Sequence, residues 1–565
     1  MEKKNIAISI LIVALVASGV GNIVLYVMVG EFVGPSPPAD TLVRATSAGP
    51  NTLELTHAWD SASNDVLEQV VENLFFYNLS DPDLPRINLL AETYFWTDTT
   101  HLQIKLREGI RFQDDTPFNA VAAKWNLDRL LFLTNCTGTN FGEVAQTTSL
   151  WSFPDGVTPI IDNVATVGAY NITITLNAPY APFLSTLTYI NAGMISPTAH
   201  AADATTFIDL TTGTVVGTGP FKYMLYIPGV EVRFDRFDGY WRGPASFNKV
   251  LYAIYSSATT AHNAFLYYAV DINAMAADQN LASYVTDPKL TVKYFTEDTG
   301  RPSLVYQYMG FNNHKYNATL RQAMAYAINY SYVIEVLRLG NAFRAVSAIS
   351  PGFGASYNAS VVGPTYDLTI ARTIMQSMDF GVGLDVNVDA DWTAVAESGT
   401  PFLSVPHTYN IGNKFREDFQ IAITSWLKLI GIEVLDDGVT WDQFLIYLDT
   451  DYDHLGIYAI GWAPDYLDPY NMIDPLFNPA SASNSAQIDD APLNAMLVAA
   501  LAETDTDDRN IIYKNIQSYL ARMQFHAPLY HSKVLYAHGA DIYGIPYNAM
   551  GALRIYPVYR SSQPL

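Results

Sequence analysis

Cysteine is nearly absent from this chain of 565 residues. The single thiol, Cys136, has no partner for an internal disulfide, and metal clusters or redox pairs built on thiolates are excluded with it. His526, His531 and His538 are spaced five and seven residues apart, which is wrong for a metal-binding pair on a helix. We therefore expect neither a metal site nor a cofactor.

Basic residues are also scarce. Lys and Arg together number 31 against 55 Asp and Glu, which gives a formal net charge of −24. A chain with this charge repels polyanions, so its composition argues against nucleic acid as a partner. The sequence also lacks the G-x-S-x-G, P-loop and H-E-x-x-H motifs of common hydrolases, nucleotide-binding proteins and zinc proteases. We expect a protein that is not an enzyme.

Only one apolar run is long enough to span a membrane, and it covers residues 6–29. Lys3 and Lys4 precede the run and acidic residues follow it, which predicts that the body of the protein lies outside the cell. A signal peptide cleaved near Ser18 is the alternative. We therefore expect a membrane anchor or signal sequence at residues 1–30, a Pro-rich linker at 31–41, and a body held at the cell surface.

Several features agree with an exterior location. Six N-x-S/T glycosylation acceptors occur, at Asn78, Asn135, Asn171, Asn317, Asn329 and Asn358. No cysteine lies near the predicted anchor, so lipid attachment is excluded there. Aromatic residues make up 13% of the chain, which suits ligand-binding surfaces, although core packing also uses them.

The apolar periodicity indicates a mixed α/β body. Residues 173–178 alternate as a strand does. Residues 416–430 carry apolar side chains at helical spacing, Gly431 ends the helix, and residues 432–434 begin a strand. A second helix is predicted at about residues 507–523. A helix followed by Gly and a strand is typical of mixed α/β layers.

Motif segments then recur in a fixed order along the chain. A strand–loop–helix unit spans residues 101–131, with Asn119 predicted to cap its helix. The later segments are GTGPFK (217–222), YW (240–241), LYYAVDI (266–272), MGFNN (309–313), LRQAMAYAIN (320–329) and HLGIYAIGWAPDYLDPYNMIDPLF (454–477). This order resembles the solute-binding proteins of family 5 of ABC transporters, the peptide- and nickel-binding class. Asp115 and Ala269 stand where the family usually has Gly.

The resemblance implies an α/β, two-lobed periplasmic-binding-protein-like fold of type II, or cluster C, preceded by one N-terminal transmembrane helix. The lobes would close on a ligand by bending at a hinge. We expect a first lobe at 42–300 and 530–565, with an inserted subdomain at about 60–185, and a second lobe at 301–529.

The resemblance also implies a function. The protein would capture peptides between its lobes and deliver them to ABC-transporter permease subunits in the membrane. The same fold could instead bind an oligosaccharide, nickel or another small solute, or serve as the sensor lobe of another membrane protein. A hydrolase that uses Asp465 and Asp468 as an acid pair is the least favoured reading, because glycosidase acids usually come from different elements.

The stretch GWAPDYLDPYN (461–471) carries the principal site prediction. In the peptide-binding members an acid in this segment meets the α-ammonium of the peptide, and Asp465 occupies the matching position. A carboxylate on a loop that leaves a strand can face a closing cleft, where exclusion of water strengthens its bond to an ammonium group. Trp462 and Tyr466 flank Asp465 as further ligand contacts.

Three other residues of the candidate site region receive separate predictions. Asp468 precedes Pro469, as an N-cap precedes the first residue of a helix, so we interpret it as a cap. Trp59 lies near the family's first cleft loop and is a candidate ligand contact. Asn312 lies where a strand enters the second lobe and is predicted to bond the ligand backbone.

Overall fold

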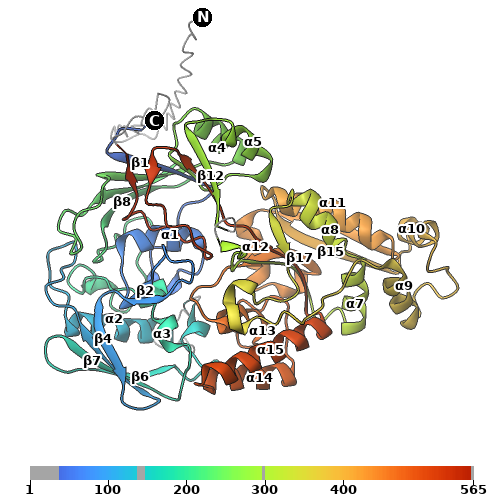
Figure 1. Cartoon of the computed structure of the whole chain (residues 1–565). Helices are drawn as coiled ribbons and strands as arrows, with labels where there is room; N and C mark the ends of the chain where they lie inside the picture. Colours follow the sequence, from blue (N-terminus) through green and yellow to red (C-terminus); the bar gives the residue numbers. More distant parts are fainter. Residues whose placement is uncertain (1–36, 136–144, 146, 296–298, 562–565) are drawn as a thin grey trace, which may run out of the picture.

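The computed structural model describes residues 37–135, 145, 147–295 and 299–561. Two α/β bodies lie side by side, each built on its own sheet (Figure 1). The predicted anchor or signal at 1–30, most of the linker, and Cys136 lie outside the described residues. Within those residues, no helix combines the length and apolar character that crossing a membrane requires.

The first sheet has seven strands in the order β12-β19-β11-β1-β10-β9-β8. β1 runs parallel to both β10 and β11, whereas β9 runs antiparallel to β10. Side chains of β1 alternate between the two faces: Leu42 packs in the main core on one face, and Val43 packs in a separate cluster on the other. The strands are β1 (Thr41–Thr46), β8 (Phe221–Ile227), β9 (Glu231–Arg236), β10 (Lys249–Ile254), β11 (Ile272–Asn273), β12 (Leu290–Tyr294) and β19 (Leu535–Gly539). Its helices are α1 (Ser61–Val70), α4 (Ala258–Leu266) and α5 (Leu281–Val285).

The second sheet has six strands in the order β14-β18-β13-β17-β15-β16. Met309 and Phe311 of β13 pack in one apolar cluster, while Tyr306 and Tyr308 of the same strand pack on the opposite face. The strands are β13 (Tyr306–Phe311), β14 (Ala342–Arg344), β15 (Leu403–Asn410), β16 (Ile432–Val439), β17 (Ile457–Trp462) and β18 (His526–Ser532). The helices around it include α7 (Ala318–Ala327), α9 (Leu368–Ser377), α11 (Lys414–Lys428), α12 (Trp441–Asp449), α14 (Ala491–Ala502) and α15 (Thr506–Met523).

A third sheet projects from the first body. It is antiparallel, in the order β4-β5-β7-β6, and α2 packs on β6 and β7. Its elements are β4 (Ala91–Trp96), β5 (His101–Leu106), α2 (Ala120–Leu133), β6 (Ile161–Thr166) and β7 (Asn171–Leu176). In Figure 1 this sheet lies close to α14, and the Ala181 amide donates to the Leu501 carbonyl at 3.1 Å. The segment that follows β7 therefore touches the body that holds the second sheet.

Local sequence rules account for several helix and strand ends. The Asn119 side chain caps α2 by accepting from the amides of Val121 and Ala122, as predicted. The predicted helix–Gly–strand unit is confirmed as α11, Gly431 and β16, with Gly431 at a φ of +77°. The predicted second helix is confirmed as α15, whose first turn is capped by Asp505.

Candidate functional site

Two motif segments meet at one buried carboxyl, that of Glu72, just after α1. Glu72 accepts hydrogen bonds from the Thr218 hydroxyl at 2.9 Å, the Tyr240 hydroxyl at 2.6 Å and the Trp241 indole at 2.9 Å. Burial raises the pKa of Glu72, against the effect of these donors. Because Thr218 belongs to GTGPFK and the two aromatic residues form the YW motif, these motifs hold the first body together. Sequence reasoning missed Glu72, which no motif singled out.

The late Arg of the 101–131 segment has a similar structural role. Arg129 pairs with Glu54 through Nη1 and Nη2, at 2.9 and 2.5 Å, and both side chains are almost fully buried. The Glu54 carboxylate also accepts from the Thr56 and Ile208 amides. This pair fixes the loop before α1, which carries Trp59.

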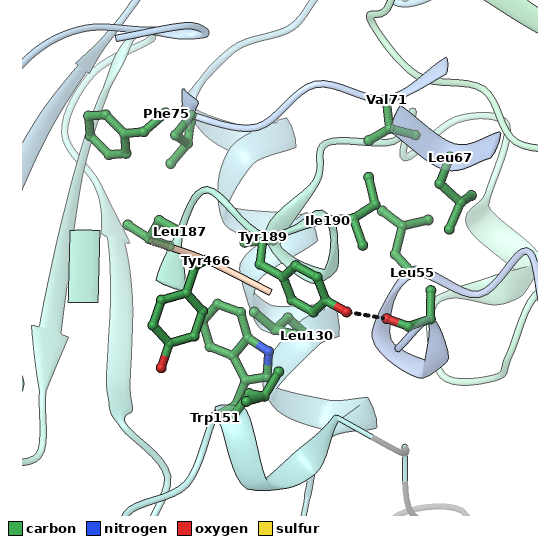
Figure 2. Packing of buried hydrophobic residues seen from close by; sticks show 14 of the residues in the cluster. Leu55, Leu67, Val71, Phe75, Leu130, Trp151, Leu187, Tyr189, Ile190 and Tyr466 are labelled. Carbon is green, nitrogen blue, oxygen red and sulfur yellow. Dashed lines mark hydrogen bonds between the residues drawn. The ribbon is translucent and has the colours of Figure 1, made fainter. Parts of the chain in front are cut away.

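The GWAPDYLDPYN loop connects β17 to a short helix, η9 (Pro469–Met472), and faces tyrosines of the first body. The Leu467 amide donates to the Tyr77 hydroxyl at 2.9 Å. Tyr466 interacts with the Tyr180 hydroxyl and is 1% exposed. Figure 2 shows Tyr466 near Tyr189 within the shared apolar core. The loop that follows the second sheet therefore meets residues of the first body and Tyr180, which follows β7.

Asp468 is a cap, as predicted, and also half of an ion pair. It accepts from the Tyr470 amide at 2.9 Å at the start of η9. Both of its oxygens also face Arg509 of α15, at 2.7 and 2.8 Å, and the Tyr513 hydroxyl donates to it at 2.9 Å. Asp468 is 7% exposed, so its carboxylate serves the fold rather than a ligand.

Asp465 differs from Asp468 in having no cationic partner among the residues that the structure describes. The Asn471 amide nitrogen donates to Oδ2 of Asp465 at 2.9 Å, and the Asp465 backbone amide donates to Oδ1 of Asn471 at 2.6 Å. The Tyr189 hydroxyl of the first body also interacts with the carboxyl. Burial raises the pKa of Asp465 to about 6. Among the described residues, no Lys, Arg or His forms an ion pair with it.

Asn471 organises the predicted site. Besides Asp465, it binds Trp462, whose indole nitrogen donates to the Asn471 carbonyl at 2.9 Å. Trp462 is half-buried and packs against the main core. Asn471 is the last residue of the GWAPDYLDPYN stretch, so the sequence contained it, but the sequence alone did not reveal which residues it contacts. The structure thus joins Asp465 and Trp462 through Asn471, whereas Tyr466 is 1% exposed and packs in the core beside Tyr180.

Trp59 lies in the first body, just before Asp60, the N-cap of α1. It is half-buried and follows Ala58, whose carbonyl accepts from the Tyr189 hydroxyl at 3.1 Å. The Tyr189 side chain also interacts with the Asp465 carboxyl. Tyr189 therefore links the loop that carries Trp59 to Asp465. Trp59 therefore stays a candidate ligand contact.

Asn312 is not brought to the site. Tyr306, at the start of β13, pairs with Trp462, while Phe311 pairs with Ile457 at the other end. At about 3.4 Å per residue, Asn312 lies roughly 20 Å along the sheet from Trp462. Its side chain donates to the carbonyls of residues 452 and 455 and accepts from the amides of 314 and 315, which uses its full capacity. The expectation failed because the antiparallel pairing sends β13 away from the edge where β17 ends.

An open groove elsewhere has no clear chemistry. It measures about 520 Å³ and is lined by Glu92, Lys105, Arg107, Glu108, Gly109, Ile110 and Trp241. Lys105 and Glu92 pair across it at 2.7 Å. Its lining mixes both charges, and two of its charged side chains, Lys105 and Glu92, already pair with each other, so we do not take it as the candidate site.

Known proteins resemble the chain over most of its length. The glutathione-binding protein GsiB of Shigella flexneri serotype 5b is 24% identical over 507 residues, which cover 85% of this chain and 88% of that protein. DppA from Helicobacter pylori, solved with the peptide STSA, has a TM-score of 0.79 at 19% identity and covers 92% of this chain and 98% of its own. The dipeptide-binding protein from Pseudoalteromonas sp. SM9913, solved with Met-Leu, has a TM-score of 0.79 at 21% identity, with 92% and 100% covered.

These structural likenesses establish the two-lobed α/β fold of periplasmic binding proteins. The relatives are substrate-binding proteins rather than enzymes. The model of bacterial extracellular solute-binding proteins, family 5, middle region, matches residues 87–484, which is well over half of the chain. With its motifs in order and its two-lobed fold, the chain belongs to the family 5 extracellular solute-binding proteins.

Proposed function

We propose that the protein binds peptides, or solutes with a similar free amine, between its lobes and passes them to an ABC-transporter permease. The observation that carries this proposal is the Asp465 carboxyl, which is only partly exposed to water and has no cationic partner in the described residues. A buried carboxylate without a counter-charge is costly, whereas the same carboxylate opposite an ammonium group is stabilised. A ligand α-ammonium would supply that missing charge.

The position of Asp465 supports the same reading. Its loop leaves the second sheet, while Tyr189 approaches from the first body, so a ligand there would touch both lobes. Trp462 and Trp59 would add flat apolar surfaces that accept varied side chains. Glutathione, STSA and Met-Leu, the ligands of three relatives, are all peptides.

We propose lobes that follow the two large sheets. The chain passes from β12 to β13 between residues 294 and 306, and from β18 to β19 between 532 and 535. The predicted return at residue 530 falls inside β18, so we move that hinge to 533–534. Small-angle X-ray scattering with and without a peptide pool tests whether the lobes close on the ligand. A radius of gyration that does not change when the protein is saturated with peptide would contradict closure.

Attachment to the membrane belongs to the same proposal. An uncleaved segment at residues 6–29 would hold the body at the cell surface beside the permease. The native protein should then retain Met1 or Glu2 and fractionate with membranes. An N-terminus mapped near residue 20 would indicate a cleaved signal instead.

Calorimetry tests the ligand class. Wild-type protein should bind a pool of two- to five-residue peptides at least about thirtyfold more tightly than the same pool acetylated at its N-termini. Asp465→Asn should lose this preference, because truncating one partner of a desolvated charge pair costs about 2–5 kcal/mol, which is about thirtyfold or more. Equal binding of both pools by wild type would exclude the amine role and favour an uncharged solute.

A further inference from the structure

One ion pair joins the two bodies close to the chain crossings. Nη2 of Arg338 lies 3.2 Å from Oδ2 of Asp278, and the two side chains are 22% and 10% exposed. Asp278 begins η5 (Asp278–Asn280), directly before α5 of the first body. Arg338 follows η6 (Val333–Leu337), which packs against α11 of the second body. The pair is therefore a charged contact between elements that belong to different sheets.

The Arg338 side chain is held on the second body. Its guanidinium lies 5.1 Å from the ring centroid of Tyr530 in β18, which is a cation–π contact. Nε of Arg338 is buried and has no hydrogen-bond partner among the described residues. Its ion-pair partner in the described part of the chain is Asp278. The opposite charge that compensates this guanidinium thus comes from the other body.

The backbone around Arg338 is unusual. η6 is a π-helix, and the Arg338 amide donates to the Val333 carbonyl, five residues back, at 3.0 Å. Leu339 and Gly340 follow at φ of +49° and +77°. Short π-helical turns are frequent at functional sites, and a Leu in the left-handed region is strained. This conformation therefore indicates that the Arg338 loop does more than fill space.

The same loop contacts the return crossing between the sheets. The Asn341 carbonyl accepts from the amide of Lys533, which lies between β18 and β19, at 3.3 Å. Asp278 instead precedes α5, which packs on β12 of the first sheet. Burial raises the pKa of Asp278, against the attraction of Arg338. Because a rotation about the crossings changes the distance between the two charges, the pair favours one arrangement of the lobes.

We propose that Asp278 and Arg338 form a latch that holds the lobes in the arrangement of Figure 1 before a ligand binds. This inference rests on the proposed function, because a latch affects binding only if the lobes close around the ligand. Apparent affinity is proportional to the fraction of molecules that already have the binding-competent arrangement. The latch would therefore raise the affinity for every ligand of the cleft without touching any of them.

Asp278→Asn tests the latch, because it removes the acid and leaves a side chain of nearly the same shape. In calorimetry, affinities for the free-amine pool and the acetylated pool should both fall about tenfold, since the exposure of this pair lies between that of surface pairs and buried pairs. The preference for free amines should stay as in wild type. In small-angle X-ray scattering, the unliganded variant should have a larger radius of gyration than unliganded wild type.

Asp65→Asn is the matched control. Asp65 pairs with Arg44 at 2.7 Å and both side chains are largely buried, but they belong to β1 and α1 of one body. This control should lower the melting temperature without changing affinity or radius. Arg338→Met, alone and combined with Asp278→Asn, completes a double-mutant cycle. If the two residues act through each other, the double variant should lose no more affinity than the weaker-binding single variant.

The outcomes separate the inference from the proposed function. Wild-type affinity for both pools in a folded Asp278→Asn variant, checked by thermal melting, would overturn the inference alone, and so would losses that add in the double variant. If wild type binds neither pool, the proposed function fails, and equal unliganded radii of wild type and Asp278→Asn would then overturn the latch as well. If Asp278→Asn does not fold, Arg338→Met takes its place, with the same expected losses and the same criteria.

Discussion

Asp468→Asn tests whether the buried ion pair, rather than the helix cap, stabilises the GWAPDYLDPYN loop. Asn retains an acceptor for the Tyr470 amide, so the cap survives in part. The Arg509 guanidinium, however, loses both of its carboxylate contacts. A cap alone contributes about 1 kcal/mol, whereas breaking a buried ion pair costs about 3–5 kcal/mol.

The exposure of Asp468 and Arg509 decides whether the cost of a lost cap or of a broken buried ion pair applies. The Arg509 and Asp468 side chains are 12% and 9% exposed, so neither can turn to water when its partner is lost. Arg509 also donates from Nε to the Ala500 carbonyl, which ties α15 to α14. We therefore expect Asp468→Asn to lower the free energy of unfolding by about 3 kcal/mol or more. Peptide affinity should stay close to wild type.

Urea unfolding followed by tryptophan fluorescence provides the measurement. Arg509→Met in the Asp468→Asn background should recover most of the loss, because no unpaired charge then stays buried. A loss below about 1 kcal/mol for Asp468→Asn alone, the range of exposed ion pairs, would refute the reasoning. A large loss of peptide affinity would instead place Asp468 in the ligand site.

Three other outcomes can be checked. The pKa of Asp465 is raised to about 6, and only its ionised form attracts an ammonium group. Affinity for amine peptides should therefore fall about tenfold per pH unit below pH 6. In the same calorimetry, the affinity for acetylated peptides should not change with pH. Asn312→Ala should lower the free energy of unfolding in urea by about 1–3 kcal/mol without changing peptide affinity, because its side-chain hydrogen bonds are lost. A large loss of affinity would show that Asn312 contacts the ligand. Gly431→Ala should cost at least about 1 kcal/mol in thermal unfolding, since φ is +77° and a Cβ would lie 2.4 Å from the Phe402 ring; a neutral effect would contradict that packing.

Local rules and motif order revealed much of this protein from its sequence. The Asn119 cap, the end of α11 before Gly431, and the cap formed by Asp468 each depend on a few neighbouring residues, and each is confirmed. The family is likewise confirmed, because its motifs are short segments in a fixed order. The importance of Asp465 as a ligand contact came from that resemblance and stays a prediction.

Tertiary structure alone supplied the partners of these residues. Arg509 lies 41 residues from Asp468, and no periodicity connects the two. Tyr189 precedes η3 in the first body whereas Asp465 follows β17 of the second sheet, and Glu72 collects donors from two motifs far along the chain. Asn312 was misplaced because a strand's sequence does not reveal at which edge of the sheet it ends. Backbone preferences act over a few residues and can be read locally, whereas charge pairing and strand direction depend on which distant segments the packed core brings together.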